Sequence, residues 1–93
     1  LDEPAVDLAV AMALVSGVRD YPIPDDMAIF GEIGLSGEVR SVPRILERVK
    51  EAQRLGFSKC VVPKSCLKQL SSLKDSIEII GVSNLKTAIS LLR

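Results

Sequence analysis

Histidine and tryptophan are both absent from this chain of 93 residues. Without histidine, the chain cannot build a histidine-ligated metal site, a histidine-based catalytic triad or a histidine pH switch. Aromatic residues make up only 3% of the sequence, so the core must consist of aliphatic side chains. The two cysteines, Cys60 and Cys66, have a C-x5-C spacing that is neither a zinc signature nor a disulfide framework. We therefore expect no metal site and two reduced, partly buried thiols, as in most cytosolic proteins.

The chain also has no net charge, because its 12 basic residues balance its 12 acidic ones. A neutral chain has no overall field to attract nucleic acid or an anionic membrane, so such a partner would need a local patch. The apolar run from Ala5 to Val18 is interrupted by Asp7 and Ser16 and is too short to cross a bilayer. No signal peptide is visible. We expect a cytoplasmic protein without membrane contact.

The residue pattern alternates between helical and extended segments. Helices are expected over residues 4–19, 43–55, 65–73 and 84–92, and strands over 27–33, 39–42, 59–62 and 77–82. The first helix is apolar almost all round, which is typical of a helix buried on most faces. Alternation of strands and helices in the second half predicts parallel pairing with right-handed crossovers. The predicted class is α/β (α+β): a mixed sheet with a β-hairpin, a parallel βαβ unit and about four helices, in one domain.

Three glycines, Gly31, Gly34 and Gly37, give the segment GEIGLSGEV a G-x-x-G-x-x-G spacing. This spacing matches neither the Walker loop nor the dinucleotide fingerprint, and a strand rather than a helix follows it. We therefore interpret the three glycines as structural residues of a hairpin turn.

Three arginines, Arg40, Arg44 and Arg48, are candidates for DNA binding. Arg44 and Arg48 are four residues apart on the predicted second helix, and Arg40 lies on the strand that leads to it. They could form a local patch that contacts phosphates. The competing interpretation is ordinary charge on a helix surface, because phosphate contacts require the basic residues to cluster in space.

The segments DDMAIFGEIGLSGEVRSVPRILERVKEAQRLGF and KCVVPKS resemble the Lon-type protease domain. That family carries a GEI-x-L-x-G-x-V hairpin, then a helix entered through a Gly-Gly turn, then a strand ending in I-P-K. The resemblance covers nearly the whole chain in the same order. It implies a Lon proteolytic-domain-like fold, also described as ribosomal protein S5 domain 2-like, for a single domain over residues 1–93.

Lon-type proteases use a Ser–Lys dyad, in which a lysine of lowered pKa takes the proton of the serine. The resemblance puts the serine position on Ala5, within EPAVD, and the lysine position on Leu46, within PRILERV. Alanine has no attacking atom and leucine cannot accept a proton, so the resemblance implies a domain that is not an enzyme. We expect Asp7 to pair with a backbone N–H or an arginine, because an unpaired carboxylate near a buried helix start is costly.

The segments LDEPAVDLAV and GEIGLSGEVRSVPRI are most similar to the C-terminal domain in the RadA/Sms family of bacterial DNA-repair proteins. In that family a zinc finger and a RecA-like ATPase precede a Lon-like domain without the dyad. The resemblance implies a role in homologous recombination, with this domain supporting a hexameric ring and helping to bind single-stranded or branched DNA. Zn, ATP and Mg would belong to the preceding domains, and no cofactor is expected here. The resemblance also implies that strands before Leu1 are missing, which would leave part of the sheet or the first helix uncovered.

The sequence alone leaves three possible functions. The first is a non-catalytic platform for oligomerisation and DNA binding within a DNA-dependent ATPase. The second is an ATP-dependent Lon-type serine peptidase, against which Ala5 and Leu46 argue. The third is a purely structural assembly domain without nucleic-acid contact.

Overall fold

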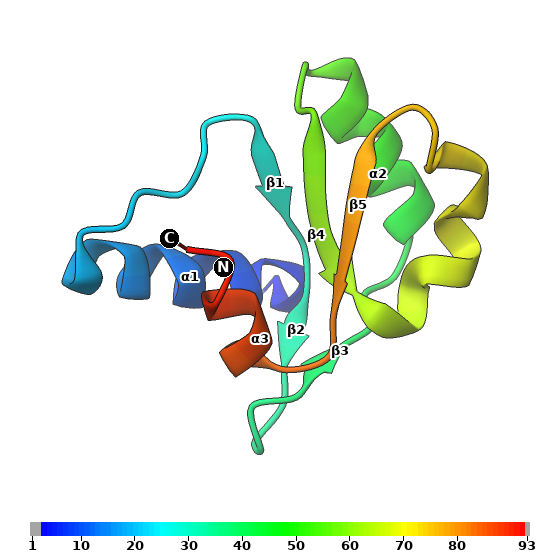
Figure 1. Ribbon diagram of the computed structural model, residues 1–93. Helices are drawn as coiled ribbons and strands as arrows, with labels where there is room; N and C mark the ends of the chain where they lie inside the picture. The colour runs from blue at the N-terminus through cyan, green and yellow to red at the C-terminus, as the bar shows by residue number, and fades with distance from the viewer. Residues whose placement is uncertain (1–2, 93) are drawn as a thin grey trace.

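The computed structural model describes residues 3–92, so Leu1 and Asp2 of the LDEPAVDLAV segment, and Arg93, lie outside the described residues. The chain folds as alternating helices and strands (Figure 1). The helices are η1 (Pro4–Val6), α1 (Asp7–Arg19), α2 (Ile45–Arg54), η2 (Lys64–Leu73) and α3 (Leu85–Ile89), where η marks a 3-10 helix. The strands are β1 (Met27–Ile29), β2 (Glu32–Ile33), β3 (Val39–Arg40), β4 (Lys59–Pro63) and β5 (Glu78–Val82).

The main sheet is parallel, with the strand order β1–β4–β5, and β2 and β3 form a separate antiparallel pair. The register places Cys60 of β4 between Ala28 of β1 and Ile79 of β5. These pairings confirm the predicted α/β class, the hairpin and the parallel βαβ unit. Helices cover both faces of the sheet, with α2 and η2 on one side and α1 and α3 on the other (Figure 1).

The core consists of two apolar clusters on opposite faces of the sheet. Because successive side chains of a strand point to opposite faces, Cys60 and Val62 pack with α2 and η2, whereas Val61 packs with α1 and α3. The side chains of Cys60, Val61 and Val62 are all fully buried. The central position of β4 explains its continuous apolar run, since both of its faces are covered.

The strand predicted over residues 27–33 is interrupted at Gly31, where the chain leaves the parallel sheet for the hairpin. The Gly31 N–H donates to the carbonyl of Ala5 (2.9 Å), and the Gly31 carbonyl accepts the N–H of Leu8 (3.0 Å). A Cβ atom at this position would lie 3.0 Å from Cγ1 of Val39. Gly31 therefore lets the strand pass close against the start of α1 while its backbone pairs with that segment.

The hairpin closes through a three-residue loop at its tip. The Gly37 N–H donates to the carbonyl of Gly34 (3.0 Å), and the Gly34 N–H donates to the carbonyl of Glu38 (2.9 Å). Gly37 has a φ of +82°, the left-handed conformation that such loops require after the turn. The returning strand β3 covers only Val39–Arg40, so it is shorter than the predicted 39–42.

Three helices differ in detail from their predictions. The third is a 3-10 helix over Lys64–Leu73, and the last is shorter than 84–92, with the Asn84 side chain accepting the N–H of Thr87 (2.8 Å) as its N-cap. The expected burial of the first helix on most faces is wrong for this chain. Only one face of α1 packs against the hairpin and α3, with Leu8 and Met12 fully buried, and nothing in residues 3–92 covers the opposite face.

Both cysteine thiols are free and buried in the cluster beneath α2 and η2. Burial raises the pKa of the Cys60 thiol from its ordinary value near 9 to about 11, because the apolar surroundings penalise the thiolate. The folded chain therefore holds this proton at a pH where the unfolded chain releases it. The stabilisation is fully present below about pH 9 and is lost as the pH rises through about 11.

We predict a loss of roughly 2–3 kcal/mol in the free energy of unfolding between these two pH values from Cys60 alone. Urea unfolding of the parent chain and of Cys60→Ala, measured in parallel at about pH 8 and about pH 11, isolates this contribution from the titration of other groups. The variant should lose less stability than the parent over this interval. Equal losses in both chains would contradict the assignment.

Candidate functional site

The two predicted dyad positions, Ala5 and Leu46, share the apolar cluster beneath α2: Ala5 belongs to it and Leu46 packs against it. Ala5 is 1% exposed and belongs to the same cluster as Ile45 and Val49, and Leu46 is partly buried and packs against that cluster. Residues 41 positions apart in the sequence are thus brought into one apolar environment. Neither side chain offers an attacking atom or a proton acceptor there.

The segment that carries Ala5 is fixed to the hairpin by backbone and side-chain hydrogen bonds. In addition to the two bonds of Gly31, a carboxylate oxygen of Asp7 accepts the N–H of Ile33 (3.2 Å). Asp7 also lies in the first turn of α1, where a negative charge interacts favourably with the helix dipole. The start of α1 is therefore held in one position relative to β2.

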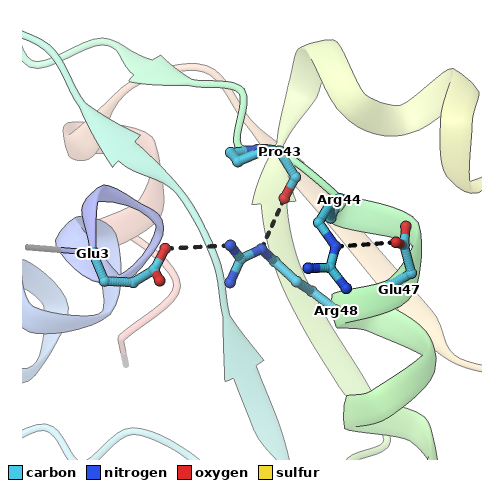
Figure 2. Close-up of polar contacts among 5 residues, drawn as sticks. All are labelled: Glu3, Pro43, Arg44, Glu47 and Arg48. Atoms are coloured by element: carbon cyan, nitrogen blue, oxygen red, sulfur yellow. Dashed lines mark hydrogen bonds and ion pairs between the residues drawn. The ribbon is translucent and has the colours of Figure 1, made fainter.

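Arg48 joins the N-terminal segment to α2 (Figure 2). Its Nη2 lies 3.2 Å from Oε1 of Glu3, and its Nε donates to the carbonyl oxygen of Pro43 (2.9 Å). The side chain of Arg48 is 26% exposed, so this contact is partly shielded from solvent. The ion pair spans the same junction as Ala5 and Leu46, two residues before the first and two after the second.

Arg44 stands next to Arg48 on the same end of α2 and carries its own carboxylate partner (Figure 2). Its Nε donates to Oε2 of Glu47 (3.1 Å), and its side chain is 75% exposed. An exposed pair of this kind contributes well under 1 kcal/mol, so it is easily exchanged for another anion.

The backbone of Arg44 adopts a left-handed conformation, with a φ of 59° and a ψ of 36°, immediately before α2. This conformation is unfavourable for residues other than glycine. It explains why α2 begins at Ile45 rather than at residue 43. This conformation could not be predicted from the residue type, because arginine does not signal a positive φ.

Arg44 and Arg48 line a groove of about 760 Å³ between β1 and α2. Apolar side chains form much of its lining, and glutamates accompany the arginines. The apolar set is Ala28, Phe30, Ala52, Leu55 and Phe57, and the acidic set is Glu3, Glu47 and Glu51. Arg40 does not line this groove; it lies exposed on β3, opposite Glu32. The structure therefore brings together two of the three candidate arginines.

Two surfaces near the site lack a covering partner within residues 3–92. β1 pairs only with β4, so its other edge is free apart from the contacts of Gly31. α1 exposes an apolar stripe along one face, formed by Val6, Val10, Leu14 and Val18. The resemblance implied that part of the sheet or of the first helix would be uncovered, but the sequence analysis did not single out these four residues, although their spacing of four was visible.

Among residues 3–92, no group of three or more histidine, cysteine, aspartate or glutamate side chains could hold a metal ion. The described helices are all too short or too polar to span a membrane.

The fold and the site define an α/β domain whose predicted dyad positions are apolar. A family model described as subunit ChlI of Mg-chelatase matches residues 2–66, and the chain belongs to this family. It is also similar to the DNA repair protein RadA of Aquifex aeolicus, with 49% identity over 90 residues, which are 97% of this chain and 19% of the relative. The RadA proteins of Bacillus subtilis and Streptococcus pneumoniae are each 46% identical, over 96% and 92% of this chain and 19% and 20% of the relatives. The chain spans about a fifth of the length of these curated relatives.

Proposed function

We propose that this chain is a non-catalytic Lon-like domain of a RadA-type DNA repair and recombination ATPase. In this role it is an oligomerisation scaffold and a DNA-binding platform. The observation that carries the proposal is the placement of Ala5 and Leu46, the dyad positions, in one apolar cluster. The similarity to RadA proteins over 89–97% of the chain supports the parent class.

The left-handed backbone of Arg44 supports the Lon-like part of the proposal. With Leu46 at the lysine position of the G-G-L-K motif, Arg44 stands where that motif has its second glycine. A glycine is favoured at such a position because it adopts a positive φ without steric cost. A positive φ at Arg44 is thus consistent with a glycine of that motif at this position, while the lysine position holds Leu46.

The uncovered surfaces of β1 and α1 support the placement of this domain in a longer protein. We propose that strands preceding Leu1 pair with the free edge of β1 and cover the stripe of Val6, Val10, Leu14 and Val18. The parent would be a cytoplasmic DNA-dependent ATPase that assembles as a hexamer. Its ATP, Mg and Zn sites would lie in the other domains.

DNA binding by this domain is assigned to Arg44 and Arg48, with Arg40 on the hairpin as a further contact. Both arginines line one groove at the start of α2, with Arg48 turned toward Glu3 and Arg44 toward Glu47 (Figure 2). Each holds a carboxylate, Glu47 or Glu3, at the distance at which it would hold a phosphate oxygen. A DNA phosphate would therefore replace an existing anion rather than enter an empty site.

We predict that replacing Arg44 and Arg48 together with alanine weakens DNA binding. The slope of log affinity against log salt should fall by about one for each lost phosphate contact. Fluorescence anisotropy of a labelled oligonucleotide over a range of salt concentrations measures both quantities. Arg54→Ala is the matched control, because Arg54 pairs with Glu51 on the same helix but does not line the groove. Unchanged affinity and slope in the double variant, with folding and assembly intact, would instead favour a purely structural assembly domain.

The enzyme alternative is an ATP-dependent serine peptidase of the Lon class. It requires a nucleophile and a base, which Ala5 and Leu46 cannot supply. A peptidase assay on this chain and on the longer parent separates the two functions. Turnover that a serine-directed inhibitor abolishes would refute the non-catalytic proposal.

A further inference from the structure

Three grooves on the surface differ in the charge of their lining. The groove between β1 and α2 carries three glutamates beside its two arginines, and a groove at the start of α1 carries Glu3, Asp7 and Glu32. A third groove, of about 740 Å³, lies between the C-terminal end of α1 and α3. Among residues 3–92, its lining includes Arg19 and Lys86 and no carboxylate. Of the three, this groove is the one in which no carboxylate among residues 3–92 competes with an anionic ligand for the cations.

The two cations of this groove are available for a ligand. Within residues 3–92, neither Arg19 nor Lys86 forms an ion pair, whereas Arg44, Arg48 and Arg54 each have a carboxylate partner. Both side chains are on exposed residues. An anion that binds here would not have to displace a carboxylate, in contrast to the groove beside α2.

Tyr21 adds an aromatic surface to the same groove. It is the only tyrosine of the chain and is 49% exposed. Its backbone is fixed at the end of α1, because its N–H donates to the carbonyl of Ser16 (3.2 Å) and its carbonyl accepts the Ser16 hydroxyl (2.6 Å). The left-handed residue Asp20 makes the turn that leads to it. The ring is thus carried on an ordered backbone next to two cations.

We propose that this groove binds single-stranded nucleic acid, with a base stacked on Tyr21 and the flanking phosphates held by Arg19 and Lys86. Leu85, Ile89 and Leu92, together with Ser90, complete the groove, and the apolar side chains shelter the stacked base from water. Aromatic stacking combined with a positively charged groove is the general mode of single-strand binding, and a duplex offers no free base face. The inference rests on the proposed DNA-binding function and adds a second contact surface. This surface lies on the face of the sheet opposite α2 (Figure 1).

Intrinsic fluorescence tests the inference directly, because the chain has one tyrosine and no tryptophan. Titration of the chain with oligothymidylate should quench the Tyr21 emission as the strand binds. Tyr21→Ala should weaken the affinity about tenfold, a typical loss for one stacked base, whereas Tyr21→Phe keeps the ring and should retain the affinity. Arg19→Ala with Lys86→Ala should lower the salt slope, whereas Lys68→Ala, an exposed lysine on η2, should not.

The outcomes separate this inference from the function on which it rests. One outcome is DNA binding that depends on Arg44 and Arg48, while DNA leaves the Tyr21 emission unchanged and Tyr21→Ala leaves the affinity unchanged. This result would refute nucleic-acid binding in the groove but would be consistent with the proposed DNA-binding function. Equal quenching by a blunt duplex would overturn the stacking mode. Quenching by an acidic peptide but not by oligothymidylate would make the groove a protein contact. No binding of DNA by the chain, with Arg44 and Arg48 intact, would overturn both proposals.

Discussion

Leu8→Ala is expected to lower the free energy of unfolding of this chain by about 3 kcal/mol. Leu8 is fully buried on the inner face of α1 and packs in the cluster with Met12, Val39 and Val61. Truncation removes buried methyl groups and leaves a cavity where β4, the hairpin and α1 meet. For a chain of this size the loss corresponds to a fall of more than about 10 °C in the melting temperature. Urea and thermal unfolding followed by circular dichroism measure it.

Leu14→Ala on the same helix is the matched control. Leu14 is 67% exposed, so its truncation should change the stability of this chain by no more than about 0.5 kcal/mol. In the longer parent, the same substitution should become costly if upstream strands cover the stripe. Equal losses in the free energy of unfolding from the two substitutions would contradict a buried Leu8 face and an exposed Leu14 face of α1.

Gly31→Ala is expected to destabilise the chain by about 1–3 kcal/mol through overpacking. The added Cβ would lie 3.0 Å from Cγ1 of Val39 and 3.1 Å from Cδ2 of Leu8, two side chains that are themselves buried. Relief requires the strand to move away from the start of α1. That movement would lengthen the hydrogen bonds of Gly31 to Ala5 and Leu8.

Gly17→Ala provides a control of opposite sign. A Cβ at Gly17 in α1 meets no atom within 4 Å, so alanine should stabilise the helix by about 0.5–1 kcal/mol. Denaturant midpoints of the two variants, measured against the parent chain, decide the comparison. A stabilising Gly31→Ala would contradict the close approach of the strand to α1.

Local patterns were sufficient to predict the elements that depend on nearby residues. The amphipathic spacing of Ile45, Val49 and Ala52 predicts α2, and their side chains are buried as that spacing requires. The glycines at 34 and 37 predict the hairpin, because the loop needs a residue of positive φ. The apolar run of β4 predicts an interior parallel strand, and β4 lies between β1 and β5. The similar run of β5 predicts an interior strand as well, but β5 is at the edge of the described sheet and most of its residues are only partly buried.

Features that depend on contacts between distant segments could not be predicted in this way. The strand breaks at Gly31 because its backbone pairs with Ala5 and Leu8, more than 20 residues earlier in the chain. The helical pattern of residues 65–73 does not distinguish an α-helix from the 3-10 helix that forms. The exposed face of α1 depends on what packs against it, which an all-round apolar sequence does not reveal.

In the candidate site, too, positions given by the local sequence pattern could be predicted, and contacts between distant segments could not. Counting along the Lon resemblance locates Ala5 and Leu46, and the structure places both against one apolar cluster. The partner of Arg48 could not be inferred, because Glu3 is 45 residues away. A binding role for Tyr21 could not be predicted either, because it depends on the cations that folding places in the same groove as its ring.

We propose that this domain, without a Ser–Lys dyad, binds DNA through the arginines near Ala5 and Leu46. The most direct test is an equilibrium titration of this chain with DNA over a range of salt concentrations. We predict binding that weakens linearly on a log–log scale, with a slope of about −0.7 to −0.9 for each phosphate contacted, and a shallower slope without Arg44 and Arg48. No detectable binding at low salt by the folded chain would contradict it.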